Sequence, residues 1–318
     1  MQVIRSLDAI PTSLTRSVLA IGNFDGMHRG HQEILRKVRE RAEQLGAQSV
    51  AVTFDPHPVR VLRPEQAPRL ITPLPQRLEL LAQTGIDATI VIPFTEAFSH
   101  LSAHDFADGI LHRSFHAIEI HEGDNFHFGH GARAGTAELQ HLGRELGFTV
   151  VAHPAITIRG ISVSSSQIRQ RIAAGEVSCA RVLLGRPFSI RSTPARGRGI
   201  GTRLTVPTIN LAPYSELLPA NGVYVTRISI GTGLNRETFD SVTNAGNRPT
   251  FGGDSYAVES HLLDFHPIDL AEDTPIELCF FAHIRPERRF DSSEALKAQI
   301  LHDVAYARRY LQLARIML

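Results

Sequence analysis

Two histidines and three glycines gather in one ten-residue segment, which is the part of the chain best suited to chemistry. Residues 22–31 read Gly-Asn-Phe-Asp-Gly-Met-His-Arg-Gly-His, after an apolar run and before apolar residues at helical spacing, which predicts a strand, a turn and a helix start. Gly22, Gly26 and Gly30 let backbone N–H groups approach a ligand, and a helix N-terminus favours phosphate. His28 and His31 share one face of the first turn. The segment therefore predicts a phosphate site built from amides and imidazoles.

Lysine is almost absent, and this restricts the phosphate chemistry. Lys37 and Lys297 are the only lysines among 33 basic residues, and no Gly-Lys-Ser/Thr ending of a Walker A loop occurs. Phosphate would therefore be held by arginine, histidine, backbone amides and metal. The net charge of +1 gives no electrostatic case for a nucleic acid or membrane partner.

Two further loops should reach the same sheet edge as segment 22–31. His57, in the Thr-Phe-Asp-Pro-His-Pro sequence of residues 53–58, either contacts a ligand or belongs to a rigid proline-bracketed loop. The aromatic residues and glycines of segment 122–131 form either an apolar slot with a floor of backbone amides or an ordinary turn. Asn125 in that segment can donate and accept hydrogen bonds, so it either binds a nucleotide or holds the loop.

Three hydroxyls precede an arginine at a predicted helix start, in the Ser-Ser-Ser-Gln-Ile-Arg sequence that runs from Ser164 to Arg169. Ordinary helix capping explains them. The alternative, favoured by the near-absence of lysine, is a clamp on the β- and γ-phosphates of a nucleotide.

The second half has its own glycine-rich segment, residues 197–210. Gly197, Gly199 and Gly201 make a loop whose amides could wrap phosphates, or an ordinary hairpin. Thr208 and Asn210 alternate along the following strand and so share one face. A hydroxyl and an amide oxygen are hard ligands, which suit Mg²⁺ bound together with nucleotide phosphates.

A carboxylate lies inside a later predicted strand of residues 257–263. Glu259 is either a general base that takes a proton from a substrate hydroxyl or an exposed residue on a solvated sheet face. The segment Asn244–Gly253 either lines the same pocket or forms a turn.

The first half alternates strands with helices, which predicts a parallel sheet covered on both faces. Ligands bind such sheets beyond the carboxyl ends of the strands. The predicted strands are 17–21, 49–54, 88–93, 117–121 and 149–152, and the predicted helices are 31–45, 76–84, 103–115 and 136–146.

The pattern changes near residues 184–186, where we place a domain boundary. Short β-type runs separated by turn residues then predict a small antiparallel barrel. These runs are 188–190, 206–211, 222–230, 241–245, 257–263 and 276–281. A last helix over residues 292–311 should pack with one face, formed by Leu296, Ile300, Val304, Ala307 and Leu311.

Taken in order, these motifs resemble the prokaryotic bifunctional riboflavin kinase/FMN adenylyltransferases (FAD synthetases). The resemblance covers nearly the whole chain and rests on some ten motifs, including 22–31, 53–58, 123–135, 164–169, 197–210, 244–253 and Ile-Arg-Pro-Glu at 284–287. It implies a Rossmann-like nucleotidyltransferase domain over residues 1–184 and a riboflavin kinase barrel over residues 185–318. The kinase would phosphorylate riboflavin to FMN, and the other domain would transfer AMP from ATP to FMN, giving FAD and pyrophosphate.

The resemblance also implies roles for individual residues. His28 and His31 would stabilise the transferring phosphate, and Glu259 would be the kinase base. Flavin binding would involve His57 and Asn125, and Mg²⁺ would be held by Thr208 and Asn210. The implied ATP- and phosphate-binding residues are Gly22, Phe24, Asp25, Gly30, Ser164, Ser165, Arg169, Gly199 and Gly201.

Two departures from the family pattern fall near the implied Mg²⁺ site, where Thr205 replaces a glycine and Ile209 replaces an alanine. One alternative is therefore an enzyme with an intact adenylyltransferase and a weakened kinase. Another is a flavin-binding or regulatory protein with inactive sites, although the joint presence of His28, His31, Asn210 and Glu259 argues against it.

Composition also predicts where the protein works. The chain has two cysteines without metal spacing, no apolar stretch of membrane length and no signal-like N-terminus, so we expect a cytoplasmic protein. Its partners should be ATP, riboflavin and FMN, without nucleic acid or membrane, and it should be a monomer or weak homo-oligomer.

Overall fold

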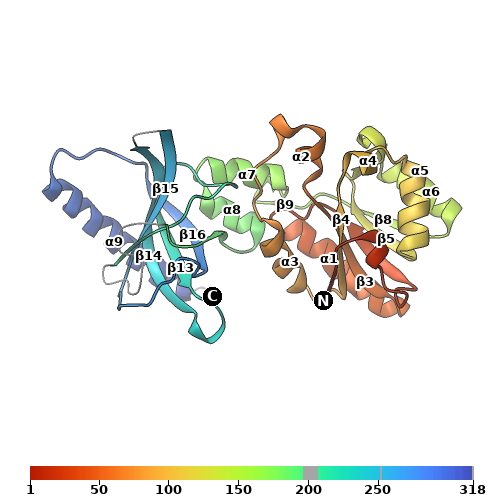
Figure 1. Ribbon diagram of the computed structural model, residues 1–318, viewed down its shortest axis with the longest axis horizontal. Coiled ribbons are helices and arrows are strands. Elements are labelled where there is room, and N and C mark those ends of the chain that lie inside the picture. The colour runs from red at the N-terminus through yellow and green to blue at the C-terminus, as the bar shows by residue number, and fades with distance from the viewer. Residues whose placement is uncertain (196–206, 251–252, 317–318) are drawn as a thin grey trace. The chain divides into compact units, whose positions relative to one another are not determined.

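The computed structural model describes residues 1–195, 207–250 and 253–316, and it divides into two compact units, Met1–Ser165 and Ser166–Leu318 (Figure 1). Each unit is described by itself. No helix within the described ranges is both long and apolar enough to cross a membrane.

The first unit is built on a six-stranded parallel sheet, as the alternating pattern predicts. The strands lie in the order β1-β4-β3-β2-β5-β8, and every neighbouring pair is parallel. Their bounds are β1 Gln2–Ile4, β2 Ser17–Ile21, β3 Gln48–Asp55, β4 Ala88–Pro93, β5 Ala117–Gly123 and β8 Thr149–His153. The three-residue strand β1 was not predicted, because it is too short to give a periodic signal.

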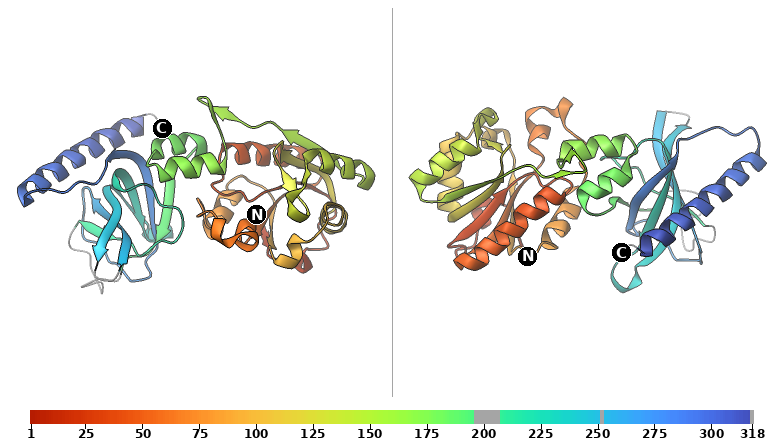
Figure 2. Two further views of the ribbon diagram at one scale, coloured as in Figure 1. Left: turned by 90° about the horizontal axis from the view of Figure 1, so that it is seen from above. Right: turned by 180° about the vertical axis from the view of Figure 1, so that it is seen from behind.

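Helices cover both faces of this sheet. On one face α1 and α3 pack through residues such as Leu35, Val38 and Leu81, and α1 is the red helix along the sheet in the right panel of Figure 2. On the other face lie the π-helical segment η3 and helix α6. The helices are α1 Arg29–Leu45, α2 Pro58–Leu62, α3 Leu74–Ala82, α4 Glu96–Ser99, α5 Ala103–Asp105, η3 Phe106–Ser114 and α6 Thr136–Leu146.

The predicted helix over residues 103–115 is confirmed, but its type changes along the segment. The chain forms the single turn α5 and then continues as the π-helical η3. Phe106 and Leu111 are both buried and five residues apart. A π-helical turn, with its i→i+5 bonds, places that spacing on one face, whereas an α-helix would not.

Short elements lie in the loops of this unit. They are the hairpin β6 (His127–Phe128) with β7 (Ala134–Gly135), the hairpin β9 (Thr157–Ile158) with β10 (Ile161–Ser162), and the 3₁₀ turns η1 (Leu7–Ala9), η2 (Pro64–Gln66) and η4 (His130–Ala132).

The second unit contains a curled six-stranded antiparallel sheet, which confirms the predicted barrel-type fold. Its order is β11-β16-β13-β14-β15-β12. Pro194, beyond β11, forms an isolated bridge with Leu211, beyond β12, so the two sheet edges meet. The strands are β11 Phe188–Ser192, β12 Thr208–Asn210, β13 Gly222–Ile230, β14 Glu237–Thr250, β15 Gly253–Leu262 and β16 Ile276–Arg285.

Helices α7 (Ser165–Ala173) and α8 (Val177–Leu184) precede this sheet, the 3₁₀ turn η5 (Gly233–Asn235) joins β13 to β14, and α9 (Ser293–Ile316) follows β16. Helix α9, the blue helix of Figure 1, packs on one sheet face through Ala307 and Leu311.

Strand β14 is much longer than the predicted strand 241–245 and includes residues 246–250, part of the segment for which a turn was one alternative. Strand β15 pairs with β14 along this whole stretch, whereas β13 stops pairing at Gly222 opposite Ala245. Among the described strands, residues 246–250 therefore pair on one side. An edge position accepts Pro249, which has no N–H to donate.

Candidate active sites

The segment after β2 forms a tight cradle that leads into α1. Phe24 and Met27 have φ values of 47° and 40°, and Gly26 has a φ of 83°. Left-handed backbone is costly for residues with side chains, and such strain concentrates at functional sites. The cradle lies at the carboxyl end of β2, as predicted.

His28 and His31 form a stacked pair at the start of α1. His28 is the N-cap residue, and its Nδ1 accepts a hydrogen bond of 3.3 Å from the His31 backbone N–H. The ring centroids are 3.6 Å apart and the planes differ by 17°. Because Nδ1 accepts, the neutral His28 ring carries its proton on Nε2, which can donate to a phosphate oxygen.

Glycine leaves close room beneath this pair. A Cβ added at Gly30 would lie 3.2 Å from two atoms of the His28 ring, so the ring would have to shift by a few tenths of an ångström to accept a side chain there. A Cβ at Gly22 would lie 3.4 Å from the ring of Phe24, and this ring packs edge-on against His31 with centroids 5.2 Å apart. The structure therefore brings together five residues that were predicted to hold phosphate.

Asp25 is fully buried and anchors the cradle from below. Its Oδ1 accepts from the backbone N–H of Thr72 at 2.8 Å and from the Thr72 hydroxyl at 3.2 Å, and its Oδ2 accepts from the Ile71 N–H at 3.1 Å. The Thr72 hydroxyl oxygen also accepts from the Gly26 N–H at 2.8 Å. These contacts give Asp25 a structural role in holding the turn, and direct phosphate binding by Asp25 stays a prediction.

Ser165 also contacts the cradle: its hydroxyl donates to the Asp25 backbone carbonyl at 2.9 Å. Helix α7 begins at Ser165, so the predicted helix start is confirmed. Ser164 directly precedes the helix, and Arg169 lies in its second turn.

An aromatic slot of about 130 Å³ opens where the loops after β3 and β5 meet. It confirms that the aromatic residues and glycines of segment 122–131 line a pocket. The lining residues are Phe54, Pro58, Leu62, Phe94, Phe98, Ser99, Leu101, Phe106, Phe126, Phe128, Gly129, Gly131 and Ala132. His57 and Asn125 are not part of this lining. His57 is buried and caps α2 by accepting from the Val59 N–H at 3.3 Å, and Asn125 is exposed.

Two buried charged groups at this edge were not predicted. Arg77 of α3 is 1% exposed and donates from Nη1 to the Asn23 carbonyl at 2.6 Å and from Nη2 to the Phe54 carbonyl at 3.3 Å. Burial lowers the pKa of its guanidinium, and the charges of Asp25 and Asp55 oppose this shift.

Glu122 is the other unpredicted group, and it lies where β2 and β5 separate. Pairing between these strands ends at Leu19 opposite Ile120, and the Glu122 Oε1 then accepts from the Ile21 N–H in place of a main-chain carbonyl. Burial raises the pKa of this carboxyl well above its usual range, because the group is 3% exposed. The chain order reverses between β2 and β5, which is where doubly wound sheets bind ligands.

In the second unit, strand pairing aligns the predicted kinase residues. Asn210 of β12 lies opposite Glu259 of β15, and Glu259 lies opposite Asn244 of β14. Thr208 lies opposite His261. Directly opposed residues of antiparallel strands project to the same face, so the predicted magnesium ligands and the predicted base share one surface.

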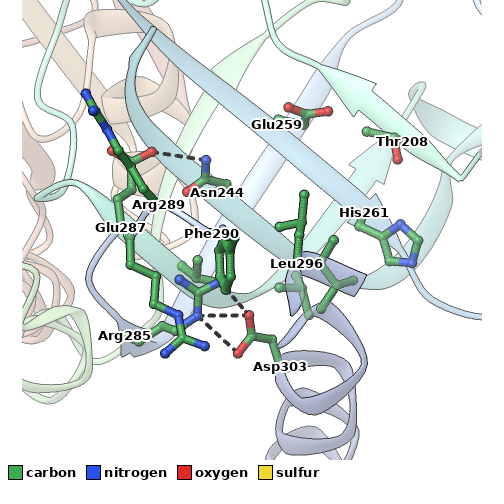
Figure 3. A pocket seen from close by; sticks show the side chains of 14 residues that line it. Thr208, Asn244, Glu259, His261, Arg285, Glu287, Arg289, Phe290, Leu296 and Asp303 are labelled. Atoms are coloured by element: carbon green, nitrogen blue, oxygen red, sulfur yellow. Dashed lines mark hydrogen bonds and ion pairs between the residues drawn. The ribbon is translucent and has the colours of Figure 1, made fainter. Parts of the chain in front are cut away.

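This surface forms one wall of a cavity of about 850 Å³, seen in Figure 3. The lining residues are Thr208, Val223, Val242, Asn244, Glu259, His261, Arg285, Glu287, Arg288, Arg289, Phe290, Leu296, Ile300 and Asp303. Asn244 therefore belongs to the pocket and not to a turn. It donates to Glu287 Oε1 at 3.1 Å, and burial lowers the pKa of His261.

An ion pair fixes α9 at the mouth of this cavity. Arg285 at the end of β16 contacts the buried Asp303 of α9 with an Nη2–Oδ2 distance of 2.9 Å, and its guanidinium lies 5.6 Å from the ring centroid of Phe290. Figure 3 shows these three side chains side by side.

The predicted packing face of α9 is only half correct. Ala307 and Leu311 are buried, but Leu296 and Ile300 are 42% and 40% exposed and line the cavity. The sheet ends before it reaches the first turns of α9, so the apolar stripe continues past the core into the pocket.

Gly199, Gly201 and Thr205 lie outside the described residues. Within the described ranges, no group of three or more histidine, cysteine or acidic side chains is placed to hold a metal.

The family models and the curated relatives agree on two enzyme domains. The family model described as FAD synthetase matches residues 10–167, and the model described as riboflavin kinase matches residues 184–311. A bifunctional riboflavin kinase/FMN adenylyltransferase from Pseudomonas fluorescens is 38% identical, with 97% of each chain covered. Proteins of the same description from Escherichia coli K12 and Haemophilus influenzae are 33% and 31% identical, covering 94% and 98% of this chain and 94% and 99% of their own.

A solved structure with the same fold is described as a macrolide-efflux protein from Streptococcus pneumoniae. It has a TM-score of 0.84 and 27% identity, and the match covers 97% of this chain and 99% of that one. That description differs from the family models and the curated relatives, which agree with each other and are more similar in sequence.

Proposed function

The chain belongs to the bifunctional riboflavin kinase/FMN adenylyltransferase family. From this premise we propose which residues carry out each of the two reactions. The protein phosphorylates riboflavin with ATP to give FMN, and it transfers AMP from ATP to FMN to give FAD. We assign adenylyl transfer to residues 1–184 and the kinase to residues 185–318, a boundary supported by the ranges of the two family matches.

The observation that carries the assignment is that each unit holds its own reactive group of residues. The stacked pair His28 and His31 begins α1 in the first unit. Glu259 and Asn244 line the cavity of the second unit, and Asn210 lies opposite Glu259 on the neighbouring strand. Each set suits a different reaction.

In adenylyl transfer the FMN phosphate is already a nucleophile, so the protein must position it and stabilise charge. We assign the Nε2–H of His28 and the imidazole of His31 to the phosphate whose bond to pyrophosphate breaks. The amides around Gly22, Phe24 and Gly30, with Ser164, Ser165 and Arg169, would hold the ATP phosphates.

We assign the flavin of this reaction to the aromatic slot, which would have to widen beyond its present volume of about 130 Å³ to hold the ring. Phe54, Phe126 and Phe128 line the slot and lie at the same strand ends as the cradle. Offset stacking on aromatic rings favours a flat conjugated ligand, so we assign the isoalloxazine ring to the slot. His57 and Asn125 would contact the flavin from outside the slot lining.

In the kinase a riboflavin hydroxyl is a poor nucleophile and needs a base. We assign this role to the Glu259 carboxylate, which would take the proton from the 5′-hydroxyl as that oxygen attacks the γ-phosphorus of ATP. The bond from this phosphorus to the β–γ bridging oxygen breaks, and ADP leaves. The apolar side chains of Phe290, Leu296 and Ile300 on the opposite side of the cavity would hold the flavin ring.

Mg²⁺ fits the alternating oxygens of Thr208 and Asn210. Both residues share a face with Glu259. Mg²⁺ usually keeps several water ligands and binds substrate phosphates, so it needs few oxygen ligands from the protein. When bound, the ion neutralises charge on the ATP phosphates. Gly199 and Gly201 would add backbone donors to these phosphates.

We also propose that the protein is cytoplasmic and acts as a monomer or weak homo-oligomer without nucleic acid or membrane partners. The support is compositional: a net charge of +1 and two free thiols, Cys179 and Cys279.

The experiment is a product assay on the purified chain with ATP and Mg²⁺ and either riboflavin or FMN. FAD formed from riboflavin, with FMN as an intermediate, is the expected result. FAD from supplied FMN alone would show an inactive kinase, FMN alone an inactive adenylyltransferase, and no product from either flavin would contradict both assignments.

A further inference from the structure

Arg77 is a fully buried arginine that contacts two separate loops of the first unit. Its Nη1 donates to the carbonyl of Asn23, in the cradle after β2, at 2.6 Å. Its Nη2 donates to the carbonyl of Phe54, at the end of β3, at 3.3 Å and lies 3.9 Å from the Asp55 carboxylate. One guanidinium thus fixes the spacing between the phosphate cradle and the strand end that leads to the aromatic slot.

The same segment supports the cradle at a second point. Ile71 and Thr72, just before α3, donate to the Asp25 carboxylate, and Thr72 accepts from the Gly26 N–H. The entry to α3 and its first turn therefore hold the strained turn through Asp25, Gly26 and Asn23.

A contribution to folding stability does not by itself explain why the buried residue 77 is an arginine. A buried charge is costly unless it is fully paired, and replacing it by an apolar side chain is often neutral or stabilising. Arg77 is incompletely paired, because its Nε has no hydrogen-bond partner among the described residues. The side chain also occupies a position of the apolar stripe of α3, one turn after Leu74 and one turn before Leu81.

We propose that Arg77 is a positioning residue for adenylyl transfer, which sets the distance between the cradle that holds ATP and the slot that holds the flavin. This inference rests on the function proposed for the first unit. A reaction between two bound substrates depends steeply on their spacing, and a misplacement of about 1 Å can cost about 100-fold in rate. Arg77 acts through two backbone carbonyls and does not itself react.

The test compares two variants. Arg77→Met keeps the length of the side chain and removes its charge and both hydrogen bonds. Arg77→Lys keeps the charge but loses the planar guanidinium whose two Nη atoms reach the two carbonyls. We expect kcat for FAD formation from FMN to fall by roughly 10- to 100-fold in Arg77→Met and less in Arg77→Lys, with KM for ATP and FMN within about threefold. The riboflavin kinase rate of the same preparations should stay at the wild-type value, and it provides an internal measure of protein concentration.

Arg41→Met is the matched control. Arg41 lies in the same unit and makes a bidentate ion pair with Glu119, with both N–O distances at 2.8 Å, away from the cradle carbonyls. This variant also loses an arginine–oxygen contact, but its kcat should not change. Circular dichroism melting gives the unfolded fraction of each variant, and the rates are measured well below each melting transition. The fall in kcat can then be compared with the unfolded fraction at the assay temperature.

A kcat within twofold of wild type in folded Arg77→Met and Arg77→Lys would overturn the inference. A loss that only follows the unfolded fraction, or an equal loss in Arg41→Met, would overturn it as well. The proposed function is judged separately by His28 variants, so its failure is distinguishable from the failure of the role of Arg77.

Discussion

The imidazole of His28 lies flat against that of His31, with centroids 3.6 Å apart, and accepts the backbone N–H of His31 at its Nδ1. One contact therefore caps the helix, fixes the tautomer and aligns both rings at the positive end of α1. A stacked pair held in this way can meet a phosphate without reorganisation.

His28→Asn separates the capping role of this residue from its chemical role. Asparagine is a good N-cap, so α1 should still begin normally, but no imidazole Nε2–H reaches the phosphate. We expect kcat for FAD formation to fall by roughly 100- to 1,000-fold with little change in melting temperature. Steady-state kinetics with supplied FMN measures this, and wild-type turnover in the variant would remove His28 from the mechanism.

Much of the cradle could be predicted because its signal is local. The glycines and histidines at fixed spacing after an apolar run indicate the turn and the helix start from the segment itself, without reference to the rest of the fold. Arg77 and Glu122 are different, because their burial depends on tertiary packing. A signal existed for Arg77, because it interrupts the apolar stripe of α3. Glu122 directly follows the predicted strand 117–121, so only the longer strand seen in the structure places it in a sheet that is covered on both faces.

Tertiary pairing also decided the elements that differ from prediction. Strand β14 extends beyond the predicted strand 241–245 to Thr250 because β15 pairs with it. The apolar stripe of α9 is correct as a pattern, but the sequence does not say that Leu296 and Ile300 face a cavity and Ala307 and Leu311 face the core.

Leu296→Ser and Ile300→Ser test the flavin side of the kinase cavity. Both residues line it and are already partly exposed, so their loss should not destabilise the fold. Because burying such a side chain contributes about 1.5–3 kcal/mol, KM for riboflavin should rise by roughly tenfold or more. Leu301→Ser is the control on the same helix, since Leu301 is 62% exposed and outside the lining. Equal effects of all three changes would contradict this assignment.

Glu122→Gln tests the buried carboxyl where β2 and β5 separate. Burial raises the folded-state pKa of Glu122, so its contribution to stability is fully present below the unfolded pKa of about 4.3 and is lost as the pH rises through the folded pKa. Glutamine keeps an acceptor for the Ile21 N–H and never ionises. The variant should therefore melt no higher than wild type near pH 5 and higher at pH 8, by about 3 °C for each kcal/mol.

The control for this pH series is Glu43→Gln, because Glu43 is exposed on α1. Its melting temperature relative to wild type should stay constant with pH. A constant difference for Glu122→Gln as well would contradict a neutral carboxyl at this position.

Asn210→Ala tests the magnesium assignment in the kinase. The Mg²⁺ concentration for half-maximal FMN formation should rise by roughly 10- to 100-fold, because an oxygen ligand is lost. The Mg²⁺ dependence of FAD formation from supplied FMN, measured on the same preparation, should not move. An unchanged requirement in the kinase reaction would exclude Asn210 as a ligand.

The most direct test of two reactions in two units uses Glu259→Gln and His28→Asn, assayed separately and as an equimolar mixture, with riboflavin, ATP and Mg²⁺, and with products separated by chromatography. Glu259→Gln should make no FMN from riboflavin yet convert supplied FMN to FAD, and His28→Asn should stop at FMN. The mixture should restore FAD from riboflavin, because FMN made by one protein can serve the other. Loss of both activities in both variants, with no FAD from the mixture, would contradict the assignment.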